Sequence, residues 1–248
     1  MLEAEEIKSN WDEYRSRVNT LFPSRADKLN KLYDDYEERI IMMPASSVAH
    51  YHNAFAGGYI DHVLRVMDCV EKLYDAWIDM GSDTSGYNRE EMMFAAMHHD
   101  LGKCGFPGKG REVYQVETSD WHRKNMGRMY KVNPNNQFTL VNDLSIWLLQ
   151  HYGISITWNE MLGIKLTDGL YDESNKPYYI SRTADSKLKN NLGYVMHQAD
   201  HMAARIEYEM WRNEQPKGGP VKKQFAKKGL SNPNVNAQAM FKDLFGDK

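Results

Sequence analysis

The chain has 248 residues, of which 42% are hydrophobic and 26% charged, so it can bury a sizeable core and is not a largely disordered protein. Its formal net charge of -3 argues against the strong basic field that favours tight nucleic-acid binding. Two cysteines are too few for a disulfide framework. An acidic N-terminus and no apolar run of membrane length predict a cytoplasmic protein.

The first 43 residues predict two charged helical stretches, separated near Phe22-Pro23-Ser24. In the second stretch, apolar side chains recur at helical spacing among charged ones. These are Leu29, Leu32, Tyr33 and Tyr36. We interpret residues 1–43 as an N-terminal helical cover that protects the core and has no chemical role.

An irregular segment from Pro44 to Gly58 contains His50 and His52 and leads into a long helix expected over residues 58–80. The apolar stripe of this helix recurs every three or four residues. It consists of Ile60, Val63, Leu64, Met67, Val70, Leu73 and Trp77. His62 lies beside the stripe and should face inward, although a single histidine there is more often a core residue than a ligand.

The residues Asn88-Arg89-Glu90-Glu91 have the form of a capping box, and they open a helix that ends at His99-Asp100. Gly102 stands where a helix commonly stops. An imidazole followed directly by a carboxylate suits a divalent transition metal. Lys103 comes next and is placed to meet an anion held by that metal.

Two further helices carry histidines on their apolar sides. The first, expected over residues 119–131, has His122 on one face with Met126 and Met129. The second, over residues 137–152, ends its apolar stripe at His151, after Leu140, Leu144 and Trp147. Both histidines are therefore predicted to face the interior.

The C-terminal third predicts a capped helix, a turn-rich segment and a long helix. Thr157-Trp158-Asn159-Glu160 is a second capping box, and residues 169–180 suggest a small hairpin. The long helix runs from near Ala184 to about Asn213, and Asp200 lies one position off its core stripe. That stripe is Val195, Ala199, Met202 and Ile206. A carboxylate against a core face is costly unless it is paired or binds metal.

Six side chains of metal-ligand type thus lie on or beside apolar helix faces: His62, His99, Asp100, His122, His151 and Asp200. Six separately satisfied core groups would be a less economical explanation than one shared metal centre. We therefore expect an all-α bundle that holds one or two divalent transition-metal ions. Four ligands would hold one ion, and the two extra histidines would allow a second.

Three segments resemble the HD superfamily of metal-dependent phosphohydrolases. Residues 57–66, Gly-Gly-Tyr-Ile-Asp-His-Val-Leu-Arg-Val, look like the helix of its first histidine. Residues 96–103, Ala-Met-His-His-Asp-Leu-Gly-Lys, look like its name-giving motif, and residues 198–203 resemble its final aspartate helix. With His122 and His151, the pattern is similar to the six-ligand, two-metal branch. Because His98 precedes His99, assigning the ligand within this pair rests on the register of the family.

The resemblance implies that residues 44–213 form an all-helical catalytic domain, in which a metal-bound hydroxide attacks the phosphoester of a nucleotide or short oligonucleotide. It implies iron or manganese ahead of zinc, nickel and cobalt. Asp100 and Lys103 would be catalytic, and Lys103 would bind a phosphate oxygen. Arg65 is a further substrate-binding candidate, although a structural ion pair explains it better. Tyr171 and Lys176 would wall the pocket unless their segment is merely solvated.

Two alternatives use the same residues differently. Some six-ligand members of the superfamily resemble diiron oxygenases that cleave a small phosphonate or polyol with dioxygen, and His/carboxylate sites accept several first-row metals. In a non-enzymatic role the core would have lost its catalytic activity, and the tail would bind a partner. The intact set of ligand residues argues against this role.

Residues 214–248 are rich in Pro, Gly, Asn and Lys and predict a flexible basic tail with a short amphipathic end. Phe241, Leu244 and Phe245 would either dock onto the protein's own helices, which we favour, or hold a partner protein through residues 237–248. The lysines before them could add weak, salt-sensitive contact with nucleic acid. No membrane partner is expected.

Overall fold

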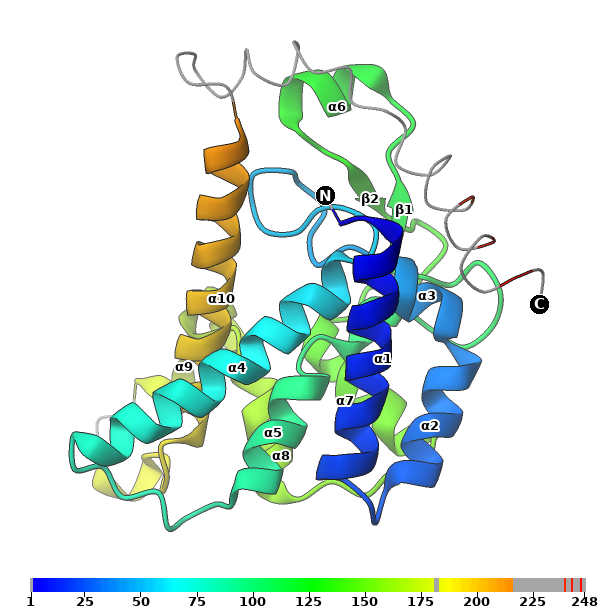
Figure 1. Cartoon of the computed structure of the whole chain (residues 1–248). Coiled ribbons are helices and arrows are strands. Elements are labelled where there is room, and N and C mark those ends of the chain that lie inside the picture. Colours follow the sequence, from blue (N-terminus) through cyan, green and yellow to red (C-terminus); the bar gives the residue numbers. More distant parts are fainter. Residues whose placement is uncertain (1, 181–182, 216–238, 240–241, 243–245, 247–248) are drawn as a thin grey trace.

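The computed structural model describes residues 2–180 and 183–215, together with residues 239, 242 and 246 (Figure 1). These residues form ten α-helices and one two-stranded sheet, which confirms the prediction of an all-α bundle. No helix in this part of the chain has both the length and the apolar character of a membrane span. The expected amphipathic end, including Phe241, Leu244 and Phe245, lies outside the described residues.

The N-terminal segment forms α1 (Ala4–Leu21), α2 (Ala26–Asp35) and α3 (Glu37–Met42). The predicted break near Phe22 is confirmed, and the second stretch divides again at Tyr36. The buried residues of α1 recur at helical spacing and belong to the same core cluster as the central helices. They are Ile7, Trp11, Tyr14 and Val18. Figure 1 shows α1 lying beside α2, and α1 packs on both α2 and α4.

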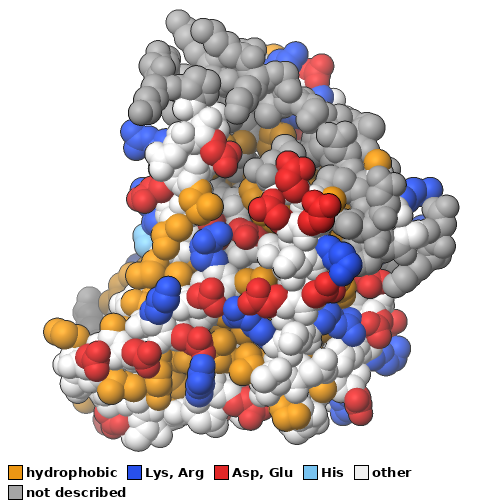
Figure 2. Space-filling view, in the orientation of Figure 1, with side chains coloured by type: hydrophobic (Ala, Val, Ile, Leu, Met, Phe, Trp, Pro, Cys, Tyr) orange, Lys and Arg blue, Asp and Glu red, His pale blue; other side chains and the backbone are white. Residues whose placement is uncertain are grey.

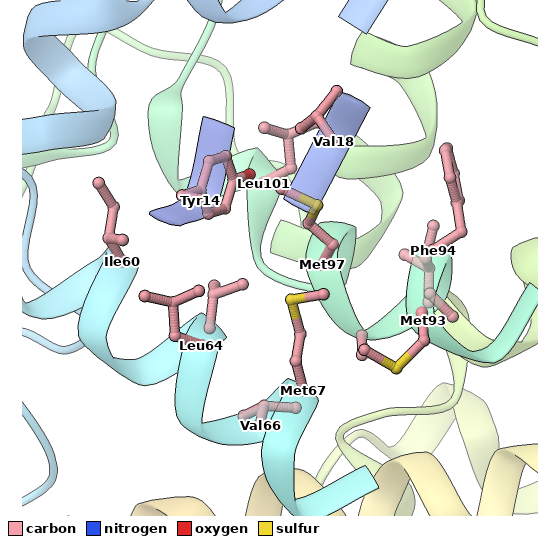
Figure 3. Packing of buried hydrophobic residues seen from close by; sticks show 14 of the residues in the cluster. Tyr14, Val18, Ile60, Leu64, Val66, Met67, Met93, Phe94, Met97 and Leu101 are labelled. Carbon is pink, nitrogen blue, oxygen red and sulfur yellow. The ribbon is translucent and has the colours of Figure 1, made fainter. Parts of the chain in front are cut away.

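The centre of the molecule is built by α4 (Gly58–Asp79), α5 (Arg89–His98) and α10 (Leu192–Glu214). Helix α4 packs against both of the others. Figure 3 shows Leu64 and Met67 of α4 gathered with Met97 of α5 and with Tyr14 and Val18 of α1. The first half of α4 is buried on nearly all sides, so His62 is enclosed together with the apolar stripe.

Helices α7 (Val141–His151) and α8 (Trp158–Lys165) complete the core. Helix α8 packs on α5, and α7 packs on the 3₁₀ turn η1 (Leu101–Cys104) that follows the His-Asp pair. Both predicted capping boxes are confirmed, because Asn88 and Thr157 each accept a hydrogen bond from the backbone of the glutamate three residues later, and each glutamate reciprocates.

The expectation of one helix over residues 119–131 is half correct. Helix α6 (Asp120–Met126) ends at Gly127, whose φ of 63° lies in the left-handed region that glycine tolerates. The chain then returns as β2 (Tyr130–Val132), antiparallel to β1 (Tyr114–Val116). This strand–helix–strand unit packs on the loop before α4 through a small separate cluster of Ala54, Met129 and Tyr130.

The hairpin expected over residues 169–180 is wrong. The segment forms the 3₁₀ turns η2 (Gly169–Tyr171) and η3 (Glu173–Asn175), followed by α9 (Lys176–Tyr179). Local side-chain hydrogen bonds replace a strand ladder: Asp172 accepts from the Ser174 amide at 2.9 Å, and Asn175 donates to the Gly169 carbonyl at 3.1 Å. A further 3₁₀ turn, η4 (Ala184–Ser186), precedes α10.

The long C-terminal helix begins at Leu192, later than predicted, and its inward stripe is rotated from the expected one. Val195 and Ala199 are buried as predicted, but Met202 and Ile206 are 40% and 38% exposed. Ala203 and Glu207 take the inward positions instead. On the face that Figure 2 presents, basic and acidic side chains are interspersed, so neither sign of charge dominates there.

Candidate metal centre

Three side chains from separate elements converge at the centre of the bundle. His62 comes from α4, His99 follows the last residue of α5, and Asp200 lies on α10. The ligand atoms of the three residues lie within 4.8 Å of one another. Oδ1 of Asp200 is 3.1 Å from Nε2 of His62 and 3.7 Å from Nε2 of His99. Two imidazoles and a carboxylate at this spacing suit a divalent transition metal.

The outer nitrogen of each imidazole is already used. Nδ1 of His62 lies 3.1 Å from both carboxylate oxygens of Glu207, and Nδ1 of His99 lies 2.8 Å from the carbonyl oxygen of Ala96. Both acceptors require a proton on Nδ1, which leaves the Nε2 lone pair of the neutral ring free to bind a metal. Nε2 is buried in both residues and makes no hydrogen bond of acceptable geometry. These unsatisfied nitrogens are what a metal ion would satisfy.

The structure resolves the assignment within the His98-His99 pair. His98 is fully buried, and its Nδ1 donates to the Phe94 carbonyl at 2.7 Å while its Nε2 lies 2.6 Å from the Tyr33 hydroxyl. Its ring also packs against Phe94, with centroids 4.1 Å apart. Both nitrogens of His98 are therefore occupied by the core, and His99 is the residue directed at the cluster.

Asp100 and Lys103 stand at the edge of this cluster. Oδ2 of Asp100 is 3.5 Å from Nε2 of His99 and 3.8 Å from Nε2 of His62, and it forms an ion pair with Lys103. Burial on its own would lower the pKa of Lys103, but the charge and hydrogen bond of Asp100, together with Tyr114 and Asp200, raise it. Lys103 is thus a buried cation beside the converging ligands.

The cluster favours ionised carboxylates. Burial alone would raise the pKa of Asp200, yet the adjacent His62 and His99 lower it well below its usual range. For His62, burial opposes the charged form, but the negative charges of Glu207 and Asp200 raise its pKa to about 10 when no metal is bound. The negative charges at this point therefore stabilise a further cation besides Lys103, either a proton or a metal ion.

A glycine at the end of the His-Asp motif allows the close packing that positions it. A Cβ at Gly102 would collide with the carbonyl oxygen of Val141 on α7. The Gly102 amide donates to Ser145 Oγ at 2.7 Å, and that hydroxyl lies 3.1 Å from the His99 carbonyl. Helix α7 therefore fixes the backbone of the motif directly, although it contributes no side chain to the three-residue cluster.

The structure does not bring His122 and His151 to the cluster. His151 is exposed and stacks on Trp147 with ring centroids 4.8 Å apart. Leu144 of the predicted stripe is buried, but the rest of the buried side of α7 is formed by Ser145, Leu148 and Leu149. His122 lies on α6, a helix without buried residues, and its Nδ1 is 3.7 Å from Glu117. The inward placement predicted for His151 is wrong, and the six-ligand arrangement is not formed.

The predicted substrate-binding residues differ in their burial and in their contacts. The guanidinium of Arg65 contacts Glu207 at 3.2 Å and Asp61 at 3.1 Å, which is the structural ion pair that the sequence favoured. Tyr171 is 79% exposed and lies flat against the His201 ring, with centroids 6.1 Å apart. Lys176 is exposed at the start of α9.

Sequence reasoning missed three residues near the centre. The ring of His52 lies 4.9 Å from that of His62, and burial lowers its pKa to about 3. Asp168 is solvent-exposed at the rim, where surrounding protein atoms and then the charges of Asp100 and Asp200 raise its pKa. His52 and Asp168 come from irregular segments, where no periodicity marks them. Glu207 could have been found, because it lies two helical turns after Asp200.

No protein-family model matches the chain, and comparison with curated proteins and with solved structures also finds no match.

Proposed function

We propose that the protein is a metal-dependent phosphohydrolase of the HD type, which hydrolyses the phosphoester of a nucleotide or short oligonucleotide. The observation that carries this proposal is the convergence of His62, His99 and Asp200 with two free, buried Nε2 atoms. These ligands occur along the chain in the order His, His-Asp, Asp, as the resemblance implies. Asp100 belongs to the motif and contacts the edge of the cluster through both histidines.

A metal ion bound here would supply Lewis acidity and lower the pKa of bound water. The residues of the chain divide the other tasks. His62, His99 and Asp200 would hold the ion, and Asp100 would complete the set from its edge. Lys103 binds a non-bridging phosphate oxygen, because it is a buried ammonium held next to the site by Asp100.

Two residues near the cluster bear on the substrate. His52 is neutral at pH 7 because of its burial, so it is suited to hydrogen bonding rather than to charge pairing with phosphate. Asp168 is an exposed carboxyl group close enough to feel the charges of Asp100 and Asp200, so a substrate hydroxyl or amine can meet it. Nucleotides offer both groups next to a phosphoester, and they are the substrate class that the resemblance implies.

The test is metal analysis and a substrate panel on protein purified without chelators. We expect about one metal ion per chain and, when Mn²⁺ is added, release of phosphate from nucleoside monophosphates or of nucleotides from short oligonucleotides. Asp100→Asn should abolish release and weaken metal binding. Oxygen uptake by the iron-loaded protein, without phosphate release, would overturn the proposal in favour of the oxygenase alternative. Metal-loaded protein that releases no phosphate from any substrate would also overturn it.

A further inference from the structure

A chain of ionic and polar contacts runs outward from the metal ligand His62. The imidazole meets Glu207, and Oε1 of Glu207 accepts from Nε of Arg65 at 3.2 Å. The Arg65 guanidinium also donates to Oδ2 of Asp61 at 3.1 Å, and the same oxygen accepts from Asn53 at 2.7 Å. The contacts thus join α10, α4 and the loop before α4.

Glu207 is the unusual member of this chain because it is only 2% exposed. A carboxylate buried to this extent is costly unless strong partners hold it. Its two partners are Arg65, which supplies a positive charge, and His62, which supplies an N–H to both oxygens at 3.1 Å. The helix geometry favours this arrangement, since His62 and Arg65 are three residues apart on α4 and share a face.

Glu207 also lies on the same helix as a metal ligand. It follows Asp200 by seven residues on α10, so both carboxylates point toward α4. Asp200 approaches Nε2 of His62, whereas Glu207 approaches Nδ1 of the same ring. Two carboxylates of one helix therefore flank the imidazole, one at each nitrogen, and rotation of the ring would break the hydrogen bonds between Nδ1 and Glu207.

We infer that Glu207 is a positioning residue for the metal site and that Arg65 is its support. Glu207 keeps the proton of His62 on Nδ1, fixes the plane of the ring and increases the basicity of Nε2 toward the metal. Arg65 keeps Glu207 ionised and prevents it from turning, while Asp61 and Asn53 hold Arg65. The inference rests on the metal site of the proposed function but not on the reaction performed there.

The competing explanation is that Glu207 and Arg65 form only a structural pair between α4 and α10. The chain offers a matched control, because Glu160 is also a buried glutamate, 1% exposed, and pairs with Arg25 at 2.8 Å. Glu160 caps α8 and does not belong to the three-residue cluster. Replacing either glutamate by glutamine removes a buried negative charge next to an arginine, with almost no change in shape.

The experiment compares Glu207→Gln with Glu160→Gln by titrating each full-length apoprotein with Co²⁺ and recording its absorption spectrum. We expect Glu207→Gln to weaken Co²⁺ binding by about 10- to 100-fold and to alter the spectrum. Glu160→Gln should keep both the affinity and the spectrum of the wild type, even where its melting temperature falls equally. Arg65→Gln retains the carboxylate, so it should weaken Co²⁺ binding by a smaller factor.

Wild-type affinity and spectrum in Glu207→Gln would overturn the inference while leaving the metal site and its proposed reaction intact. Failure of wild-type protein to bind Co²⁺ would overturn the metal site and the inference together. If Glu207→Gln does not fold, Arg65→Gln decides: unchanged Co²⁺ affinity and spectrum in that variant would equally overturn the role of the chain of contacts.

Discussion

The α4–α5–α10 centre and the two helices α6 and α7 contain histidines that look alike in the sequence. In the centre, His62 and His99 are at most 4% exposed and point their Nε2 atoms at Asp200. On α6 and α7, His151 is exposed and His122 lies on a helix without buried residues. A histidine on a predicted apolar stripe is therefore brought to the candidate metal centre only where its helix is enclosed from more than one direction.

The largest contrast is expected in metal binding. His99→Ala should weaken metal affinity by more than about 100-fold, since removal of a direct ligand costs more than the loss of an outer partner. His151→Ala should leave affinity unchanged because the ring only stacks on Trp147 at the surface. Metal titrations of the two variants check this. Equal losses in both would show that the α7 histidine belongs to the site after all.

His98 and His122 should differ in their contributions to stability rather than to metal binding. His98→Ala removes a buried ring and leaves the Tyr33 hydroxyl unpaired, so we expect a loss of about 3 kcal/mol in the free energy of unfolding, with metal stoichiometry retained. His122→Ala, on the exposed unit, should change stability by less than about 0.5 kcal/mol. Urea denaturation measures both. A stable His98→Ala variant that binds no metal would reverse the assignment of the pair.

The two lysines predicted near the substrate should differ in their effect on the rate of phosphate release. Lys103→Met should keep the metal and lower phosphate release by about 100-fold, because it removes a preorganised charge at the site. Lys176→Met, at an exposed position of α9, should have little effect on kcat. Steady-state kinetics of the two variants provide the comparison. Full activity in Lys103→Met would remove this lysine from the mechanism.

The last expected effect, which is the smallest when counted per pH unit, is on the pH dependence of stability. Burial lowers the pKa of His98 to about 3, so the folded state keeps this ring neutral while the unfolded chain binds a proton below about pH 6.5. Its contribution is therefore present above pH 6.5 and is lost as the pH falls toward 3, by up to about 1.4 kcal/mol per pH unit. Denaturation of the wild type and of His98→Phe across this range should show a shallower slope in the variant. Identical slopes would contradict the account of His98.

The spacing of apolar residues in the sequence predicted the buried face correctly where helices are long and enclosed. The break near Phe22, both capping boxes and the stripe of α4 are confirmed because each depends on local chemistry or on a wide apolar face. The same spacing predicted the wrong buried face for α7 and α10, whose predicted apolar stripes differ from the buried ones by a rotation of the helix. A stripe that includes Trp147 or Met202 looks equally apolar when it is half exposed, and only tertiary packing chooses between the alternatives.

Local sequence patterns could predict only some of the residues at the site. His62, His99 and Asp200 were predicted as ligands, and the structure brings them together. His52 and Asp168 approach the same centre from irregular segments, where contact depends on the path of the chain. The hairpin expected over residues 169–180 failed for a related reason, since side-chain contacts to the backbone formed helical turns instead.

The most direct test is diffraction from a metal-soaked crystal, recorded on both sides of the absorption edge of the metal. The account predicts one anomalous peak at about 2.0–2.2 Å from Nε2 of His62, Nε2 of His99 and Oδ1 of Asp200. It also predicts no peak beside His122 or His151. A metal peak beside either of those histidines and none at the α4–α5–α10 centre would contradict the account.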